Sequence, residues 1–256
     1  DRALEIANAA DLQWHIGPTL LGLDHARACT GKYGEAWLGM QKTMHWLDSL
    51  EQVRYLLIAY AFVGELLLDL NLPGQVIDTM ERGLSLARRT GIHYWGPVLE
   101  AHLAVARMRL GSRDGIPALE AVLVQTRTQS ERYLMLRCLD ALAELTLAEA
   151  DTRRCHAFSE ELLALAESNG LREAGARARR WRGEALLMDQ APAQALTELS
   201  AAAEQAESIG RVRLQMDLEL ALGRAFTSLD QPHEAALHRR NAAEIRREIG
   251  ASLESS

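Results

Sequence analysis

Apolar and small residues recur along this chain with helical spacing, and short polar turns interrupt them at regular intervals. No segment alternates as a β-strand would, so the pattern predicts an all-α fold. The expected helices come in pairs whose members are roughly 15–20 residues long. These pairs are 13–30 and 34–49, 52–70 and 74–90, 93–110 and 114–128, 131–149 and 152–168, 171–188 and 192–208, and 211–228 and 232–248.

A turn recurs between the two helices of each pair, and the residue just before it serves as an anchor for comparing the pairs. The anchors are Gly31, Asn71, Gly111, Ala150, Gln190 and Asp230. Successive anchors are 40, 40, 39, 40 and 40 residues apart. Such constant spacing over six units is not expected by chance, so the chain contains an internal repeat of about 40 residues.

Positions that share an offset from the anchor also share a character. Seven residues before it stand Asp24, Gly64, Ala104, Ala143, Gly183 and Gly223. A small residue there lets two helices approach closely. Five residues after it stand the apolar or small residues Ala36, Val76, Ile116, Cys155, Ala195 and Ala235.

Glycine and proline positions predict where the second helices begin and end. Pro73, Pro192 and Pro232 lie two residues past an anchor, where a helix begins and a missing N–H is harmless. The remaining prolines are expected near helix starts, with Pro18 and Pro97 at the beginnings of first helices. Twenty residues after an anchor, glycine is predicted to end the second helix at Gly91, Gly170, Gly210 and Gly250.

The helix pairs, the small-residue column and the alanines of GEA36, AQA195 and HEA235 resemble the tetratricopeptide repeat family. The period of 40 rather than 34 and the missing closing proline are departures from that pattern. Longer units of this kind resemble the helical-repeat regions of large bacterial signal-transduction ATPases, and of cyclase-type or maltose-activator-type transcriptional regulators. The resemblance implies a right-handed superhelix, an α-solenoid, in which the first helices line a concave surface.

The expected domain is one array over 1–250, with units at about 13–50, 52–91, 93–129, 131–170, 171–210 and 211–250. Residues 1–11 are expected to be the second helix of a preceding unit, and 251–256 a frayed tail. Because the chain starts at Asp1 directly in a helical pattern, we expect it to be part of a longer protein.

By analogy with the family, concave positions fall 13, 10 and 6 residues before each anchor. In the first three units they are mostly apolar or neutral, namely Pro18, Leu21, His25, Ile58, Ala61, Glu65, Val98, Ala101 and Val105. In the last three they are mostly charged, and the candidate partner-binding residues are Arg137, Asp140, Glu144, Arg177, Arg180, Glu184, Asp217 and Arg224. Two interpretations remain open: a peptide groove with an apolar and an ionic end, or a charged set that pairs across adjacent first helices together with an apolar set that neighbouring domains cover.

Composition and charge narrow the class of function. The net charge of −7 argues against a general nucleic-acid binder. Three scattered cysteines fit a reducing compartment, so a cytoplasmic location is expected. The apolar run at 55–70 contains Glu65 and Asp69 and is shorter than a bilayer requires, so it predicts a buried helix.

The sequence carries no phosphate-loop, dinucleotide or nucleophile-elbow motif, and no HExxH. We therefore expect no catalytic residue, cofactor or metal site. Cys155 and His156 are neighbours, but adjacent helical residues point away from each other. The arginines of LREAGARARRWR are either a grip for phosphate or an acidic peptide, or an ion-paired face.

The pattern favours a non-enzymatic interaction module whose partner is a protein, a peptide or other domains of the same parent chain. A second hypothesis is an effector-sensing domain, in which aromatic side chains stack on a small molecule inside the superhelix. The candidate aromatics are Trp14, Tyr60, Tyr94, Trp95 and Trp181.

Overall fold

The computed structural model describes residues 13–254, and within that range all regular structure is helical. The first three pairs are α2 (Gln13–Cys29) with α3 (Tyr33–Ser49), α4 (Val53–Asp69) with α5 (Pro73–Thr90), and α6 (Gly96–Arg109) with α7 (Gly115–Thr128). The next three are α8 (Arg132–Ala148) with α9 (Thr152–Ser168), α10 (Arg172–Met188) with α11 (Pro192–Ile209), and α12 (Val212–Ser228) with α13 (Pro232–Glu254). The predicted all-α helical-repeat fold is confirmed.

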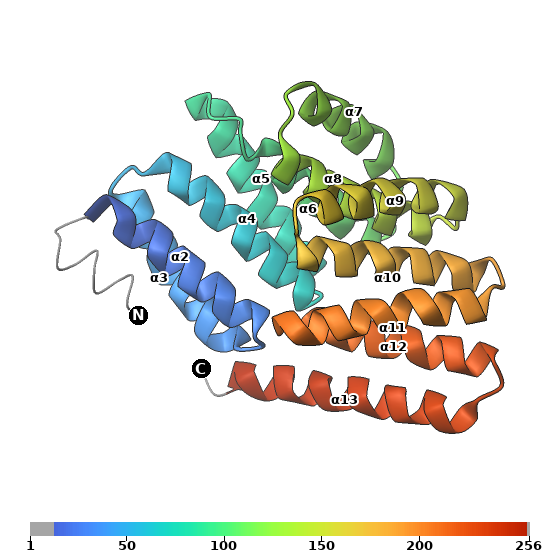
Figure 1. Ribbon diagram of the computed structural model, residues 1–256. Helices are drawn as coiled ribbons and strands as arrows, with labels where there is room; N and C mark the ends of the chain where they lie inside the picture. The colour runs from blue at the N-terminus through green and yellow to red at the C-terminus, as the bar shows by residue number, and fades with distance from the viewer. Residues whose placement is uncertain (1–12, 255–256) are drawn as a thin grey trace. The chain divides into compact units, whose positions relative to one another are not determined.

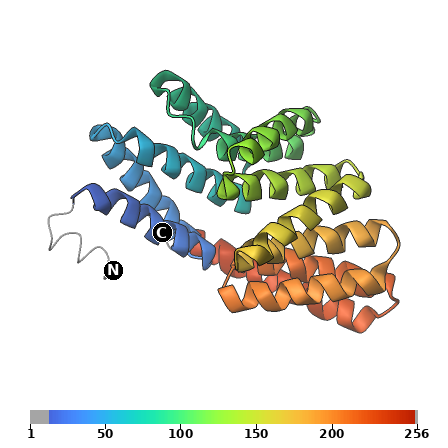
Figure 2. The ribbon, with the colours of Figure 1, turned by 45° about the horizontal axis from the view of Figure 1, so that its top comes forward.

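The chain divides into two compact units. Unit 1 comprises residues up to Ala106 together with the segment from Ile249, and unit 2 is Arg107–Glu248. In unit 1, α2 packs against α3 and α4 against α5 (Figure 2). In unit 2, α10, α11 and α12 lie side by side with alternating direction (Figure 1). Helices adjacent in sequence are therefore neighbours in space, as expected of helical hairpins.

The anchor column has a common backbone conformation. All six anchors are left-handed, with φ of 86° at Gly31, 55° at Asn71 and 93° at Gly111. The other three are non-glycine residues, with φ of 59° at Ala150, 60° at Gln190 and 56° at Asp230. The turns after the second helices repeat this conformation, at Glu51, Gly91, Ser130, Gly170 and Gly210.

Ten of these eleven left-handed residues, all but Gly91, close the preceding helix with the same backbone hydrogen bond. The N–H of the following residue reaches back five positions, as from Leu72 to the carbonyl of Leu67, at 2.9 Å. The same bond, also 2.9 Å long, joins Ala191 to Leu186. This is the Schellman arrangement, which satisfies carbonyls that the helix end would leave unpaired. The recurring turn is therefore a helix stop that permits immediate chain reversal.

The two sequence columns form the contact between helices. All six residues five positions after the anchors are buried. The small-residue column is buried as well, and Gly183 shows why it is small: a Cβ there would lie 2.6 Å from Cγ of Leu199 on the facing helix. Leu199 belongs to the core of unit 2, together with Leu214 and Leu218.

Asp24 is the exception in the small-residue column, and the facing helix compensates for it. Its side chain is only 2% exposed and accepts a hydrogen bond of 2.8 Å from Arg27. A Cβ on Gly39 of α3 would lie 2.2 Å from the Asp24 carboxylate. In this pair the small residue, Gly39, lies on the second helix instead of the first, so the two helices still approach closely. Burial raises the pKa of the Asp24 carboxyl, although Arg27 opposes that rise.

Most predicted boundaries agree with the observed helices, but the last one was wrong. Gly250 does not end α13, which continues to Glu254, so residues 251–254 are helical rather than frayed. Glycine permits a left-handed conformation without requiring one, and the helix formers Ala251 and Leu253 follow it. The predicted helix over 1–11 and residues 255–256 lie outside the described residues.

Two further sequence predictions can be compared with the structure. Pro73, Pro192 and Pro232 are the first residues of α5, α11 and α13, as expected. Pro18 is the sixth residue of α2, just past the first turn, where its missing N–H removes one helical hydrogen bond. The run at 55–70 falls largely within α4 and is mostly buried. Within the described range, no helix combines the length and apolarity needed to cross a membrane.

Glycine at a strained anchor should stabilise the protein. Ala150→Gly relieves a left-handed conformation that disfavours a Cβ, and we expect about 0.5–1 kcal/mol of added stability in urea unfolding. Ala164→Gly, at an exposed position in the middle of α9, is the control and should lose about 1 kcal/mol. Equal losses at both positions would contradict this reading of the anchors.

Alanine substitutions within the small-residue column should differ according to what faces them. Gly183→Ala and Gly223→Ala gain the same helix propensity, but only the first pushes a Cβ into fully buried Leu199. At Gly223 the nearest atom is Cγ of the exposed Arg239, at 3.3 Å. We expect Gly183→Ala to be less stable than Gly223→Ala by about 1–3 kcal/mol in urea unfolding. Identical stabilities would show that packing does not require the small residue.

Candidate functional site

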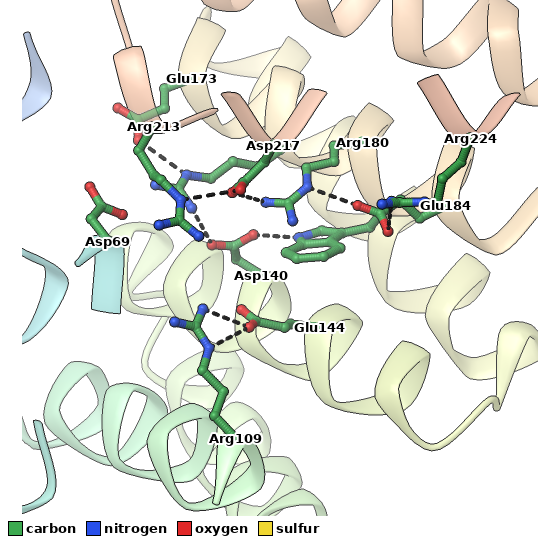
Figure 3. Close-up of polar contacts among 12 residues, drawn as sticks. Asp69, Arg109, Asp140, Glu144, Glu173, Arg180, Glu184, Arg213, Asp217 and Arg224 are labelled. Carbon is green, nitrogen blue, oxygen red and sulfur yellow. Dashed lines mark hydrogen bonds and ion pairs between the residues drawn. The ribbon is translucent and has the colours of Figure 1, made fainter. Parts of the chain in front are cut away.

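The charged candidate residues lie on the first helices of unit 2, where they form a network that we call the arginine–carboxylate ladder (Figure 3). Its members come from α8, α10 and α12, together with one residue at the end of α6 and one just before α12. They are Arg109, Asp140, Glu144, Glu173, Arg177, Arg180, Glu184, Arg211, Arg213, Asp217 and Arg224.

The rungs that join successive first helices begin on α6 and α8. Arg109 donates to Oε1 of Glu144 at 2.9 Å. On the next step, Nη1 of Arg177 lies 3.5 Å from Oδ2 of Asp140. These partners are 35 and 37 residues apart in the sequence. The ion pairs therefore follow the repeat itself.

The same pattern continues from α10 to α12. Arg180 donates to Oδ2 of Asp217 at 2.9 Å, and Arg224 to Oε2 of Glu184 at 2.7 Å. Their sequence separations are 37 and 40 residues. Nη2 of Arg211 lies 2.7 Å from Oε1 of Glu173. Each carboxylate is thus held by a guanidinium from the neighbouring unit of the repeat.

Pairs within one helix brace these rungs. Arg180 donates to Glu184 of its own helix at 3.1 Å, and Arg213 donates to Asp217 at 3.1 Å. Both pairs are four residues apart, the spacing that places side chains on one helical face. Asp217 therefore accepts from two arginines, and Arg180 donates to two carboxylates. The ladder is a connected network rather than a set of isolated pairs.

Trp181, a buried side chain of α10, also contacts the ladder. Its indole N–H donates to Oδ1 of Asp140 at 2.7 Å, and the side chain is only 4% exposed. The guanidinium of Arg180 lies over the indole ring, 4.2 Å from its centroid. This cation–π contact and the hydrogen bond fix both side chains from a second direction.

The electrostatics of the ladder favour charged partners throughout. Burial disfavours the charged form of Arg180, but Asp217, Glu184 and Glu144 outweigh it and raise the pKa of Arg180 above its usual range. Burial likewise acts to raise the pKa of Asp217, yet Arg180 and Arg213 hold that pKa below its usual value. Both groups stay ionised at neutral pH.

The structure brings together seven of the eight candidate residues proposed from the sequence, and the eighth, Arg137, is half-buried one turn before Asp140 on α8. The pairing interpretation of the charged set is therefore confirmed for these seven. Binding of a partner to this face stays a prediction.

Sequence reasoning did not name Trp181 or Arg109 as members of the ladder. Trp181 contacts the ladder through its indole N–H, and the sequence does not reveal in which direction that N–H points. Arg109 lies two residues before an anchor, outside the three offsets that the family analogy supplied. The four-residue spacings of Glu173 with Arg177 and Arg213 with Asp217 were a usable signal for the remaining pairs.

The apolar candidates of the first three units are mostly buried. Leu21, Ala61, Val98, Ala101 and Val105 are almost fully covered. They offer little surface to a partner, so the predicted apolar end of a groove has no counterpart at these positions.

The arginine-rich segment of α10 is ion-paired, as the second interpretation of that segment expected. Arg179 binds Glu167 at 3.0 Å and Glu198 at 3.3 Å, and Arg182 binds Glu198 at 3.2 Å. These contacts use arginines that a phosphate or an acidic peptide would otherwise take.

Cys155 and His156 have separate environments. Burial raises the pKa of the Cys155 thiol to about 12, and nearby carboxylates add to that rise. His156 contacts Asp189 at 2.9 Å, where the hydrogen bonds from Thr152 and His156 lower the pKa of the aspartate. A protonated, buried thiol is a poor nucleophile. Over residues 13–254, no cluster of three or more His, Cys, Asp or Glu side chains is arranged to hold a metal ion.

The aromatic candidates for an effector site have different surroundings. Trp181 is buried in the ladder, whereas Tyr94 is exposed and packs edge-on against Trp95. Tyr60 lines an open groove of about 610 Å³ in unit 1. The side chain of Trp14 lies outside the described residues.

No protein-family model matches this chain, and no curated protein matches it significantly in sequence. The helical-repeat fold is thus established by the structure, and the comparisons supply no function.

Removing one ladder carboxylate should destabilise the protein in a pH-dependent way. Because the folded state lowers the pKa of Asp217, its contribution is present above the unfolded-state pKa and is lost as pH falls through the folded-state pKa. Asp217→Asn should cost about 1–3 kcal/mol near pH 7. The difference from wild type should shrink as the pH is lowered toward about 3.

Urea unfolding followed by circular dichroism across that pH range measures this effect. Glu207→Gln, at an exposed position on α11 without an ion pair among the described residues, is the control and should change stability little at any pH. A pH-independent loss for Asp217→Asn would assign its role to packing instead of charge.

Proposed function

We propose that this chain is a non-catalytic protein-binding module, and that it forms part of a larger bacterial signalling or transcriptional regulator. The observation that carries the proposal is the ladder face itself: first helices present fixed charges at the interval of the repeat. Its partner is a protein or peptide, or another domain of the same parent chain. Helical repeats of the tetratricopeptide type, which this chain resembles, use first-helix surfaces in this manner.

The ladder offers a partner oriented charges at low entropic cost. Arg177, Arg180 and Glu184 are held by neighbours on two sides and keep 16–18% of their side chains exposed. Arg224 at one end is 52% exposed. Groups that are already ordered lose little further freedom on binding, which favours affinity.

An exposed aromatic lies beside the ladder. Tyr133 is 41% exposed on α8 and precedes Arg137, Asp140 and Glu144 by four, seven and eleven residues. These spacings place it on the same helical face. Within the repeat it occupies the position that Glu173 and Arg213 hold on α10 and α12. Tyrosine and arginine are among the residues that contribute most binding energy at protein interfaces. We therefore expect Tyr133 to be the main contact of this face with a partner.

The effector-sensing alternative has weaker support on this face. Trp181 would have to leave Asp140 and Arg180 before it could stack on a ligand. For unit 2 we therefore place the protein-binding role ahead of a small-molecule role.

Site-specific photo-crosslinking tests the proposal in cells that express the full-length parent protein. A benzophenone amino acid replaces either Tyr133, on the ladder face, or Glu160, at an exposed position on the second helix α9. We expect one defined protein product, or a defined intramolecular product, from position 133 and none from position 160.

Sensitivity to charge distinguishes specific binding from chance contact. Arg224→Glu reverses an exposed ladder charge and should reduce the crosslink from position 133 at least about fivefold. Equal crosslinking from both positions, or yields that Arg224→Glu leaves unchanged, would contradict a binding role for this face.

A further inference from the structure

Unit 1 contains a second, independent surface feature. A shallow open groove of about 610 Å³ runs along α5, between the end of α3 and the first half of α4. Its volume lies in the range of known ligand sites. It belongs to different helices from the ladder, so neither feature depends on the other.

The floor of the groove is apolar and its walls are polar. Leu56 is buried, and Tyr60 and Leu86 are half-buried beneath the opening. Ser85 adds a hydroxyl to the wall. Such a floor accepts an aliphatic or aromatic side chain, while the wall orients polar groups beside it.

Four charged groups of the groove, two arginines and two aspartates, differ from those of the ladder in forming no ion pair with a described residue, and Glu81 lies beside them in the lining. Arg82 and Arg89 of α5 are exposed and form no ion pair with any described residue. The same holds for the carboxylates of Asp48 and Asp78. These two arginines and two aspartates therefore line one groove without forming ion pairs with each other. In the ladder, by contrast, arginines such as Arg180 are ion-paired with carboxylates.

Tyr60 lies within the influence of these charges. Burial raises the pKa of its hydroxyl, Arg82 and Arg89 oppose that rise, and Asp48 adds to it. The hydroxyl is neutral at physiological pH and can donate to, or accept from, a ligand on the groove floor.

The spacing along α5 indicates the size of the occupant. Arg82 and Arg89 are seven residues apart and share one helical face. From Asp78 to Arg89 the helix rises about 16 Å. A single small zwitterion carries its charges only a few ångströms apart and cannot reach both ends, whereas an extended peptide can.

We propose that this groove binds a short peptide segment in which an apolar side chain is flanked by an acidic and a basic residue. The apolar side chain rests on the half-buried Tyr60 and Leu86. Arg82 and Arg89 hold the acidic group, and Asp48 or Asp78 receives the basic one. Charge complementarity selects this occupant over a purely apolar or a uniformly charged segment.

Selection of random twelve-residue peptides displayed on phage, against the intact chain, tests the proposal. Enriched peptides should share an apolar residue with an acidic and a basic neighbour. Synthetic versions are then titrated by fluorescence anisotropy against wild type, Arg82→Gln, Arg89→Gln and Arg54→Gln. Arg54 is the matched control, an exposed arginine of α4 outside the groove.

We expect Arg82→Gln and Arg89→Gln each to weaken binding on the order of tenfold, because each removes a charge-assisted hydrogen bond. Arg54→Gln should bind as wild type does. No enrichment of mixed-charge peptides, or equal affinity for all four proteins, overturns the proposal. Displacement of the peptide by an equal concentration of free glutamate or arginine would also overturn it, in favour of a small-molecule site.

This result is separable from the test of the ladder face. The groove variants leave α8, α10 and α12 untouched, and the crosslinking positions leave α5 untouched. Failure in one experiment therefore does not determine the outcome of the other.

Discussion

The left-handed residue that follows each helix from α2 to α12 is the constraint on which the rest of the structure depends. It lets the next N–H reach back to a carbonyl five positions earlier, as Leu72 does to Leu67, so the helix ends with its backbone satisfied. The chain can then reverse at once. Because this occurs at a constant interval, equivalent side chains in successive units meet at equivalent heights. The small-residue column and the ladder both follow from that alignment.

In the ladder, this alignment brings arginines and carboxylates of successive first helices close enough to form a connected network of ion pairs. A single exposed pair such as Arg247 with Glu244 contributes little to stability. In unit 2, Asp217 and Arg180 each form one ion pair within their own helix and one with the neighbouring first helix, and both side chains are partly shielded from water. The repeat multiplies one favourable arrangement over several first helices. The same regularity that stabilises the unit leaves a patterned polar face for a partner.

Sequence reasoning reached the fold because the repeat is local and periodic. Helix starts at Pro73, Pro192 and Pro232 and the left-handed stops at Gly170 and Gly210 have direct backbone causes. Gly250 shows the limit of this reasoning, since glycine allows a stop that only the following chain can require. Among residues 13–254, six non-glycine residues adopt the same left-handed conformation, and their register within the repeat is what they share.

The candidate site was less predictable because it depends on orientation. The offsets named most of the charged ladder, but not that Trp181 would donate to Asp140, since an indole in a helical pattern is equally suited to a core. The groove beside Tyr60 was not predictable as a site. Its members come from three helices, and whether Arg82, Arg89, Asp48 and Asp78 reach an opposite charge is a matter of distance that no spacing rule specifies.

The interval of the ion pairs restricts how this sequence can change in length. Inserting one residue in the middle of α10 would turn the side chains beyond it by about 100°, moving Arg180 and Glu184 off their partners on both neighbouring helices at once. Adding or removing a complete helix pair would instead keep the orientation of the remaining first helices, because the ion pairs recur at the interval of the repeat. Lineages of this protein should therefore differ by whole hairpins more readily than by single residues inside a first helix.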